Sequence, residues 1–210
     1  MIGVLVDLDG VLWFSEKLHK DAFIKVFEEL TVDARKLVNQ TWEFGEPTHQ
    51  YAVRLLKILG IEKQEQILQD FIVKKRFYAN EPDFVPLNTR LIKKLSQMKK
   101  NNIKLALVSS SSNLNVGKFL TLSKTPNLFD FKVDSTMVVN PKPSPDCYNY
   151  AMHKLKLAPD KCLAIEDSEI GIQSATNANI KIVLKYSGET KEDEFYAKLE
   201  SGVKKIQKND

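Results

Sequence analysis

Four segments of the chain are almost continuously apolar, and each has about the length of a β-strand. They are residues 2–8, 103–109, 162–166 and 180–184. Strands that are covered by helices on both faces have this pattern, because neither face meets water. Between these four segments, the apolar residues have the spacing of helices. This alternation of strand and helix predicts an α/β fold built on a doubly wound parallel sheet.

Helix signals lie between and after these strands. Residues 91–98 have helical apolar spacing just before the second strand. A second helix is predicted to begin at Ser144 and Pro145, because a capping hydroxyl followed by proline is typical of a helix start. A third spans residues 169–178 and ends at Asn179, since Asn tolerates the left-handed conformation of a helix stop. A short terminal helix is predicted over residues 195–206.

The interval of residues 15–84 breaks the alternation. It contains three helical apolar faces and no strand signal, which predicts a helical cap inserted between the first and second strands. Residues 1–14 and 85–210 would then form the Rossmann-like core. The chain is expected to cross into the cap near Phe14 and to return between Pro82 and Pro86. Two crossings that lie close together would act as hinges.

Composition indicates an ordinary globular protein. A chain of 210 residues with 43% hydrophobic content can bury a full core. No apolar run approaches the ~20 residues that a membrane span needs, and no leader precedes the first strand, so we expect a cytoplasmic protein without membrane contact. The two cysteines, Cys147 and Cys162, lack metal-ligand spacing and fit a reducing compartment. The net charge of +4 is scattered, and its densest basic group fits a solvated helix face, so we expect no nucleic-acid partner.

Polar residues that carry chemistry lie at or just after the ends of three of the predicted strands. They are Asp7, Asp9, Ser109, Glu166 and Asp167. Ligands in parallel α/β sheets bind beyond the carboxyl ends of the strands, so we expect these side chains to converge. Lys142 adds an ammonium group between two prolines, which hold its backbone stiffly. Paired carboxylates, a hydroxyl, an ammonium and a second acidic pair suit a magnesium-assisted phosphoryl transfer site.

Each segment also has a simpler interpretation. The segment of Asp7 and Asp9 fits a turn after a strand, and Lys142 fits an ordinary surface lysine. The serine run of residues 109–112 fits a polar loop, and we retain that interpretation for Ser111 and Ser112. Ser168 fits the cap of the following helix. The occurrence of all the segments in this order favours a shared site.

With these motifs the chain resembles the haloacid dehalogenase superfamily, in its branch of small phosphatases and beta-phosphoglucomutase-like enzymes. The resemblance covers residues 2–184, although residues 15–84 match only loosely. Beyond the segments named above, it rests on the run Ile165-Glu166-Asp167-Ser168-x-x-Gly171-Ile172-x-Ser174-Ala175. It implies a Mg²⁺-dependent phosphatase that acts on a small phosphorylated metabolite, and we expect a monomer.

The resemblance also implies roles for individual residues. Asp7 would attack phosphorus and form an aspartyl-phosphate, while Asp9 would protonate the leaving alcohol and later take a proton from water. Phosphate would be bound by Ser109, the Ser110 backbone amide and Lys142. His19 aligns with a histidine that can face the substrate, although a helix-surface position fits it nearly as well. The expected Mg²⁺ ligands are the Asp7 side chain, the Asp9 backbone carbonyl and Asp167, with Glu166 as a ligand or behind one.

Two rival functions remain open. Mutase members of the branch carry a phosphate-gripping arginine near the position of Thr48, so its absence here favours hydrolysis. A catalytically silent phosphate-binding or partner-binding module would keep the fold without the activity, and the complete set of motifs argues against it. Phe14 stands where many relatives have Asp, which makes the crossing into the cap more apolar. The cap matches the family least, so the sequence does not predict which metabolite is the substrate.

Overall fold

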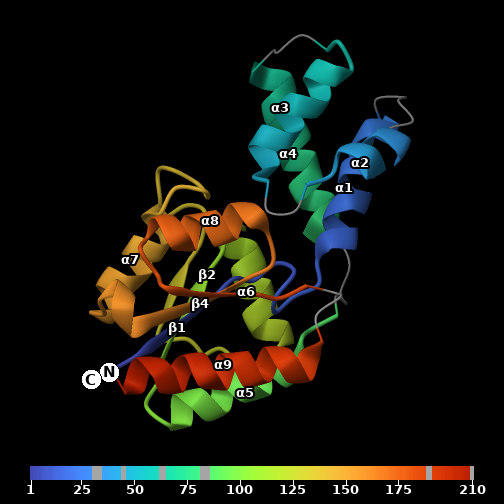
Figure 1. The fold of residues 1–210 in the computed structure, drawn as a ribbon. Coiled ribbons are helices and arrows are strands. Elements are labelled where there is room, and N and C mark those ends of the chain that lie inside the picture. The colour runs from blue at the N-terminus through green and yellow to red at the C-terminus, as the bar shows by residue number, and fades with distance from the viewer. Residues whose placement is uncertain (30–34, 44–45, 62–64, 81–85, 188–190, 209–210) are drawn as a thin grey trace. The chain divides into compact units, whose positions relative to one another are not determined.

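The computed structural model describes residues 1–29, 35–43, 46–61, 65–80, 86–187 and 191–208, which form two compact units (Figure 1). The core unit comprises Met1–Phe14 and Leu87–Asp210, and the helical unit comprises Ser15–Pro86. The boundary predicted at residue 84 and the crossing predicted at Pro82 lie outside the described residues. Within the described ranges, every helix is too short or too polar to cross a lipid bilayer.

The core unit is organised around a parallel sheet of five strands in the order β3-β2-β1-β4-β5. The strands are β1 (Gly3–Val6), β2 (Lys104–Val108), β3 (Phe131–Val133), β4 (Cys162–Glu166) and β5 (Ile182–Lys185). The predicted α/β fold with a parallel sheet is confirmed. Side chains of β1 and β4 are buried along the whole of each strand, which explains their unbroken apolar sequence.

The register of the sheet brings three strand ends to one level. Val6 at the end of β1 pairs with Leu107 of β2 on one side and with Ile165 of β4 on the other. The ladder extends one residue further, because the Asp7 N–H donates to the Ile165 carbonyl at 3.0 Å. The residues that follow β1, β2 and β4 therefore emerge side by side.

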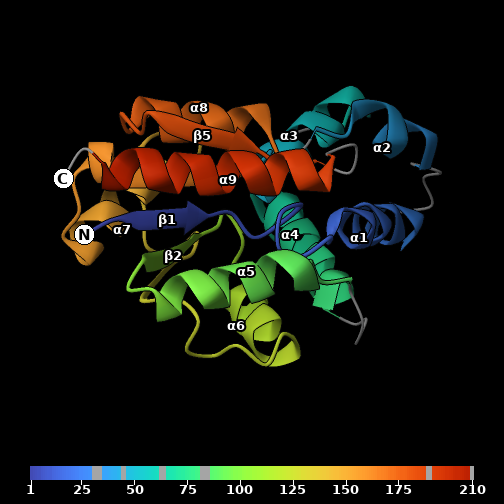
Figure 2. The same cartoon turned by 60° about the horizontal axis from the view of Figure 1, so that its bottom comes forward.

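Helices cover both faces of the sheet (Figures 1 and 2). α7 (Asp146–Leu155) and α8 (Glu169–Asn177) lie on one face, and α5 (Thr89–Lys100) and α9 (Glu192–Gln207) lie side by side on the other. Arg90 of α5 forms ion pairs with Glu192 and Asp193 at the start of α9. These pairs are exposed and are worth little, so burial of apolar side chains supplies most of the packing energy.

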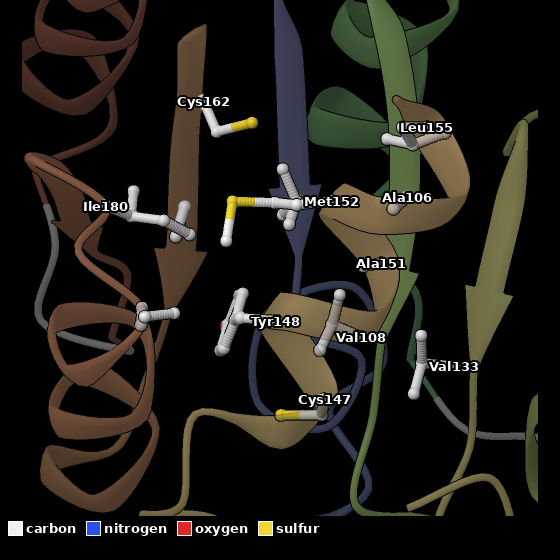
Figure 3. Close-up of a cluster of buried hydrophobic side chains, with 14 residues drawn as sticks. Ala106, Val108, Val133, Cys147, Tyr148, Ala151, Met152, Leu155, Cys162 and Ile180 are labelled. Atoms are coloured by element: carbon white, nitrogen blue, oxygen red, sulfur yellow. The ribbon is translucent and has the colours of Figure 1, made fainter. Parts of the chain in front are cut away.

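The buried layer between α7 and the sheet supports the strand ends (Figure 3). Tyr148 and Met152 of α7 extend over the strands, and Cys147 and Cys162 are both buried free thiols in this layer. A buried aliphatic or aromatic side chain contributes about 1.5–3 kcal/mol, so this layer anchors α7 firmly. The loop that precedes α7 is thereby held against the carboxyl end of the sheet.

The helical unit contains α1 (Glu16–Glu29), α2 (Arg35–Thr41), α3 (Thr48–Ile58) and α4 (Glu65–Asn80). Its own core is rich in aromatic rings, with Phe23 packed edge-on against Tyr51 at 4.8 Å between ring centroids. The apolar faces predicted from the sequence thus pack against one another within this unit.

Several local details differ from the sequence-based predictions. Neither β3 nor α6 (Asn113–Leu122) was predicted. β3 carries little sequence signal because it has only three residues and its middle residue is a lysine. α7 begins one residue later than predicted, at Asp146 with Pro145 as the capping residue, and Ser144 Oγ accepts from the Asp146 N–H at a long 3.4 Å. The predicted helix stop at Asn179 is confirmed by its positive φ of 63°.

Candidate active site

The carboxyl ends of the central strands bring most of the predicted site residues together. Asp7 and Glu166 are buried there and both contact Lys142. Ser109 follows β2 and is also buried, and its N–H donates to the Val133 carbonyl at 3.0 Å. The Tyr186 N–H likewise donates to the Glu166 carbonyl at 2.7 Å. Backbone hydrogen bonds of the sheet therefore fix the positions from which these side chains project.

Lys142 reaches this point from the loop before α7. Its ammonium lies 2.6 Å from Asp7 Oδ1, 2.6 Å from Glu166 Oε1 and 3.1 Å from the Val108 carbonyl. Three acceptors match the three hydrogens of an ammonium, so this group is fully hydrogen-bonded although it is only 4% exposed. The interpretation of Lys142 as an ordinary surface lysine is thus wrong.

Burial and charge act in opposite directions on this group. Burial by itself would lower the pKa of Lys142, but the carboxylates of Asp7 and Glu166 outweigh it and raise the pKa above its ordinary value. Burial also raises the pKa of Asp7; Lys142 opposes this rise, whereas Glu166 and Asp167 add to it. One cation, Lys142, thus faces the carboxylates of Asp7, Glu166 and Asp167, so the cluster as a whole carries more negative than positive charge.

Tyr148 is a part of this arrangement that the sequence analysis missed. It lies on α7, is fully buried, and its hydroxyl donates to Glu166 Oε1, the same oxygen that accepts from Lys142. Burial, reinforced by Glu166, raises the pKa of Tyr148 well above its ordinary value, so the phenol remains a donor. Its place three residues after Pro145 gave no sign of this role.

The acidic residues form a cluster that fits a hard divalent cation. Ligand oxygens of Asp7, Glu166 and Asp167 lie within 4.8 Å of one another, and all-oxygen donor sets suit Mg²⁺ or Ca²⁺. Burial raises the pKa of Asp167 to about 7; Glu166 adds to this rise, whereas Lys142 opposes it. Glu166 Oε2 is buried and has no hydrogen-bond partner among the described residues.

Two glycines make room for these carboxylates. Gly10 has a φ of +78°, and a Cβ there would lie 1.9 Å from Asp167 Oδ2. A Cβ at Gly171 would lie 2.0 Å from Glu166 Oε2. Ser168, between the two acids and α8, accepts from the Gly171 N–H at 3.1 Å, which confirms its predicted role as a helix cap.

Asp9 lies beside the serine loop. Its Oδ2 accepts a hydrogen bond of 2.7 Å from Ser111 Oγ. Ser109 Oγ accepts from the Ser111 N–H at 2.9 Å, and Ser110 lies half-buried between them. The interpretation of Ser111 as a polar loop residue is therefore incomplete, because its hydroxyl contacts a predicted catalytic carboxylate. Phosphate binding by Ser109 and Ser110 stays a prediction.

His19 belongs to the helical unit and not to the core unit. Its Nδ1 lies 3.0 Å from Lys75 Nζ, and Lys75 also donates to Thr48 Oγ1 at 3.2 Å. Lys75 is only 4% exposed and lies 5.1 Å from the centroid of the Phe23 ring. The predicted contact of His19 with substrate stays a prediction.

We predict that Tyr148→Phe lowers the free energy of unfolding by about 1–3 kcal/mol, because a buried hydrogen bond to a charged group is lost. Tyr150→Phe on the same helix is the control, since the Tyr150 ring packs against Phe131 without contacting the acidic cluster. Urea denaturation of both variants measures the difference. Equal stability of Tyr148→Phe and wild type would contradict the prediction.

Comparison with known proteins agrees with this geometry. Residues 4–185 match the model of the haloacid dehalogenase-like hydrolase family. The phosphorylated carbohydrates phosphatase of Thermotoga maritima is 28% identical over 86% of this chain and 83% of its own length. The beta-phosphoglucomutase of Bacillus subtilis is 30% identical over 86% of this chain and 81% of its own.

A crystal structure of CbbY from Rhodobacter sphaeroides in complex with phosphate is similar with a TM-score of 0.72, at 25% identity over 91% of this chain and 90% of that one. A mutant of the same protein was crystallised with xylulose-(1,5)bisphosphate. The family match spans most of the chain, including every predicted site residue of both units. The chain belongs to the haloacid dehalogenase-like hydrolase family.

Proposed function

We propose that the protein is a Mg²⁺-dependent phosphomonoesterase that hydrolyses a phosphorylated sugar or a similar small metabolite through an aspartyl-phosphate on Asp7. The observation that carries the proposal is the buried contact of Lys142 with Asp7 at the end of the central strand. The relatives named for phosphorylated carbohydrates and for a bound phosphate support the substrate class. The family match and the arrangement of the site residues together favour an enzyme over a silent binding module.

Asp7 is proposed to act as the nucleophile. Lys142 holds Oδ1 of this carboxylate, which orients the group for attack on phosphorus. As the Asp7–phosphorus bond forms, the bond from phosphorus to the substrate oxygen breaks, and Asp9 gives its proton to the leaving oxygen. In the second half-reaction, Asp9 takes a proton from water, the water oxygen bonds to phosphorus, and the Asp7 carboxylate leaves with inorganic phosphate as the product.

The phosphate would be held by groups around Asp7. Ser109 Oγ accepts from the Ser111 N–H, so its own hydrogen is available for a phosphate oxygen. The Ser110 amide would add a further donor, and the positive charge of Lys142 would balance the negative charge of the nucleophile and the phosphate. Mg²⁺, held by the side chains of Asp7 and Asp167, the Asp9 carbonyl and Glu166, would neutralise negative charge on nucleophile and phosphate.

Substrate choice is assigned to the helical unit. His19 is proposed to bind substrate, and Lys75 lies beside it as a second polar group. The mutase alternative is supported by the resemblance to a beta-phosphoglucomutase. Against it, Thr48 replaces the expected arginine, and the nearby Arg54 is already bound by Glu46 and the Thr41 carbonyl. We therefore favour hydrolysis.

Magnesium dependence is the first test. Purified protein should release phosphate from 4-nitrophenyl phosphate and from a panel of sugar phosphates with Mg²⁺, and excess chelator should abolish release. Because a ligand that binds the folded state stabilises it, Mg²⁺ should also raise the melting temperature of the wild type but not of Asp167→Asn. Glu169→Gln, an exposed acid of the same segment, should keep the shift. Full activity in chelator would contradict the mechanism.

Asp7→Asn should abolish turnover with little change in shape, since the amide is a poor nucleophile. Asp9→Asn should slow both half-reactions by about 10²–10⁴-fold, because acid–base transfer is lost. Steady-state and single-turnover phosphate release measure both effects. Beryllofluoride, a mimic of the aspartyl-phosphate, should bind wild type but not Asp7→Asn. Retention of more than a few per cent of activity by Asp7→Asn would exclude Asp7 as the nucleophile.

Hydrolysis and mutase activity are separated by the response to a sugar bisphosphate. We expect net phosphate release from hexose or smaller monophosphates and no stimulation by hexose bisphosphate, because Arg54 is held by Glu46 and not free to grip a second phosphate. The assay follows glucose 6-phosphate and free phosphate from glucose 1-phosphate. Bisphosphate-dependent isomerisation faster than phosphate release would identify a mutase, with Arg54, Lys74 and Lys75 as the residues to test next.

A further inference from the structure

Ser111 is held by three hydrogen bonds at the carboxyl end of the sheet. Its N–H donates to Ser109 Oγ at 2.9 Å, and its carbonyl accepts from the Ser135 N–H at 2.9 Å. Its hydroxyl donates to Asp9 Oδ2 at 2.7 Å. These contacts join the loops that follow β2, β3 and β1. The hydroxyl of Ser111 is therefore presented to Asp9 from a fixed backbone.

The adjacent serine has a different task. Ser112 is the N-cap of α6, and its Oγ accepts from the Asn115 N–H at 3.4 Å. Two neighbouring serines of one loop thus differ in what their hydroxyls contact. One stabilises a helix start, whereas the other contacts the carboxylate proposed as the acid and base. This difference supplies a matched pair of variants.

We propose that Ser111 is a positioning residue for Asp9. The inference rests on the proposed function, because it concerns the proton transfers assigned to Asp9. An Asp side chain can rotate about two bonds, and a hydrogen bond from a braced hydroxyl to Oδ2 restricts both. A carboxyl group held in one orientation is better placed to give a proton to the leaving oxygen and, later, to take one from water.

The expected effect follows from the geometry of proton transfer. A displacement of about 1 Å in a reacting group can cost roughly 10²-fold in rate. Loss of the Ser111 hydroxyl leaves the Asp9 carboxyl in place but removes the hydrogen bond that orients its Oδ2. The decrease in rate should therefore appear only with substrates whose leaving group needs a proton. A phenolate with strong electron-withdrawing groups leaves without one, whereas an alkoxide does not.

The test compares Ser111→Ala with wild type in single turnovers of two substrates, an alkyl phosphate and 2,4-dinitrophenyl phosphate. Release of the alcohol or phenol reports the first half-reaction alone. We expect Ser111→Ala to slow alcohol release by about 10–10²-fold and dinitrophenol release by less than about 2-fold. KM and the Mg²⁺-induced melting shift should not change. Ser111→Thr should restore the alcohol rate, and Ser112→Ala should alter neither rate.

Other outcomes overturn the proposal. Equal slowing of both substrates, or a raised KM for both, would assign Ser111 to loop structure or to phosphate binding. An unchanged alcohol rate would show that Asp9 needs no positioning by this hydroxyl. The double variant Ser111→Ala/Asp9→Asn should be no slower than Asp9→Asn alone, and additive effects would contradict the coupling. A wild type that hydrolyses no phosphate ester would instead refute the proposed function, and the inference with it.

Discussion

A single buried ammonium group organises the carboxyl end of the sheet. Lys142 arrives from the loop before α7 and contacts Asp7 after β1, Glu166 of β4 and the Val108 carbonyl of β2. Removing one member of a buried ion pair commonly costs about 3–5 kcal/mol, because the remaining charge loses its partner. The loop, three strands and the proposed nucleophile therefore depend on the same contacts. The hydrogen bonds of Lys142 thus contribute both to the stability of the fold and to the proposed chemistry.

Glu166 and Asp167 are adjacent in sequence but have different surroundings. Glu166 is the last residue of β4, fully buried and held by Lys142 and Tyr148. Asp167 is less buried and lies against Gly10, and its pKa is raised to about 7. We interpret Glu166 chiefly as the acid that fixes Lys142, and Asp167 as the acid more accessible to a cation. Glu166 still belongs to β4, whereas Asp167 lies in the bend between β4 and α8, so the two side chains leave the backbone in different surroundings.

The sequence predicted those features that depend on local pattern. Long buried strands have unbroken apolar runs, so β1, β2 and β4 and the residues after them were found, and Asn179 was recognised by its backbone tolerance. β3 was missed because three residues with a lysine in the middle carry no pattern, yet it pairs with β2 along its whole length. Tyr148 and Ser111 were missed because their partners, Glu166 and Asp9, are 18 and 102 residues away in sequence. Contacts over such separations have no local signal.

The two glycines that adjoin the acidic cluster have a consequence for how this sequence can vary. Neither Gly10 nor Gly171 has a side chain that could take part in chemistry, yet even a methyl group at either place would collide with a carboxylate. The next larger residue, alanine, would displace Asp167 in one case and Glu166 in the other. In a screen of random variants these positions should therefore tolerate substitution poorly. The absence of a side chain at Gly10 and at Gly171 is thus itself a requirement of the site.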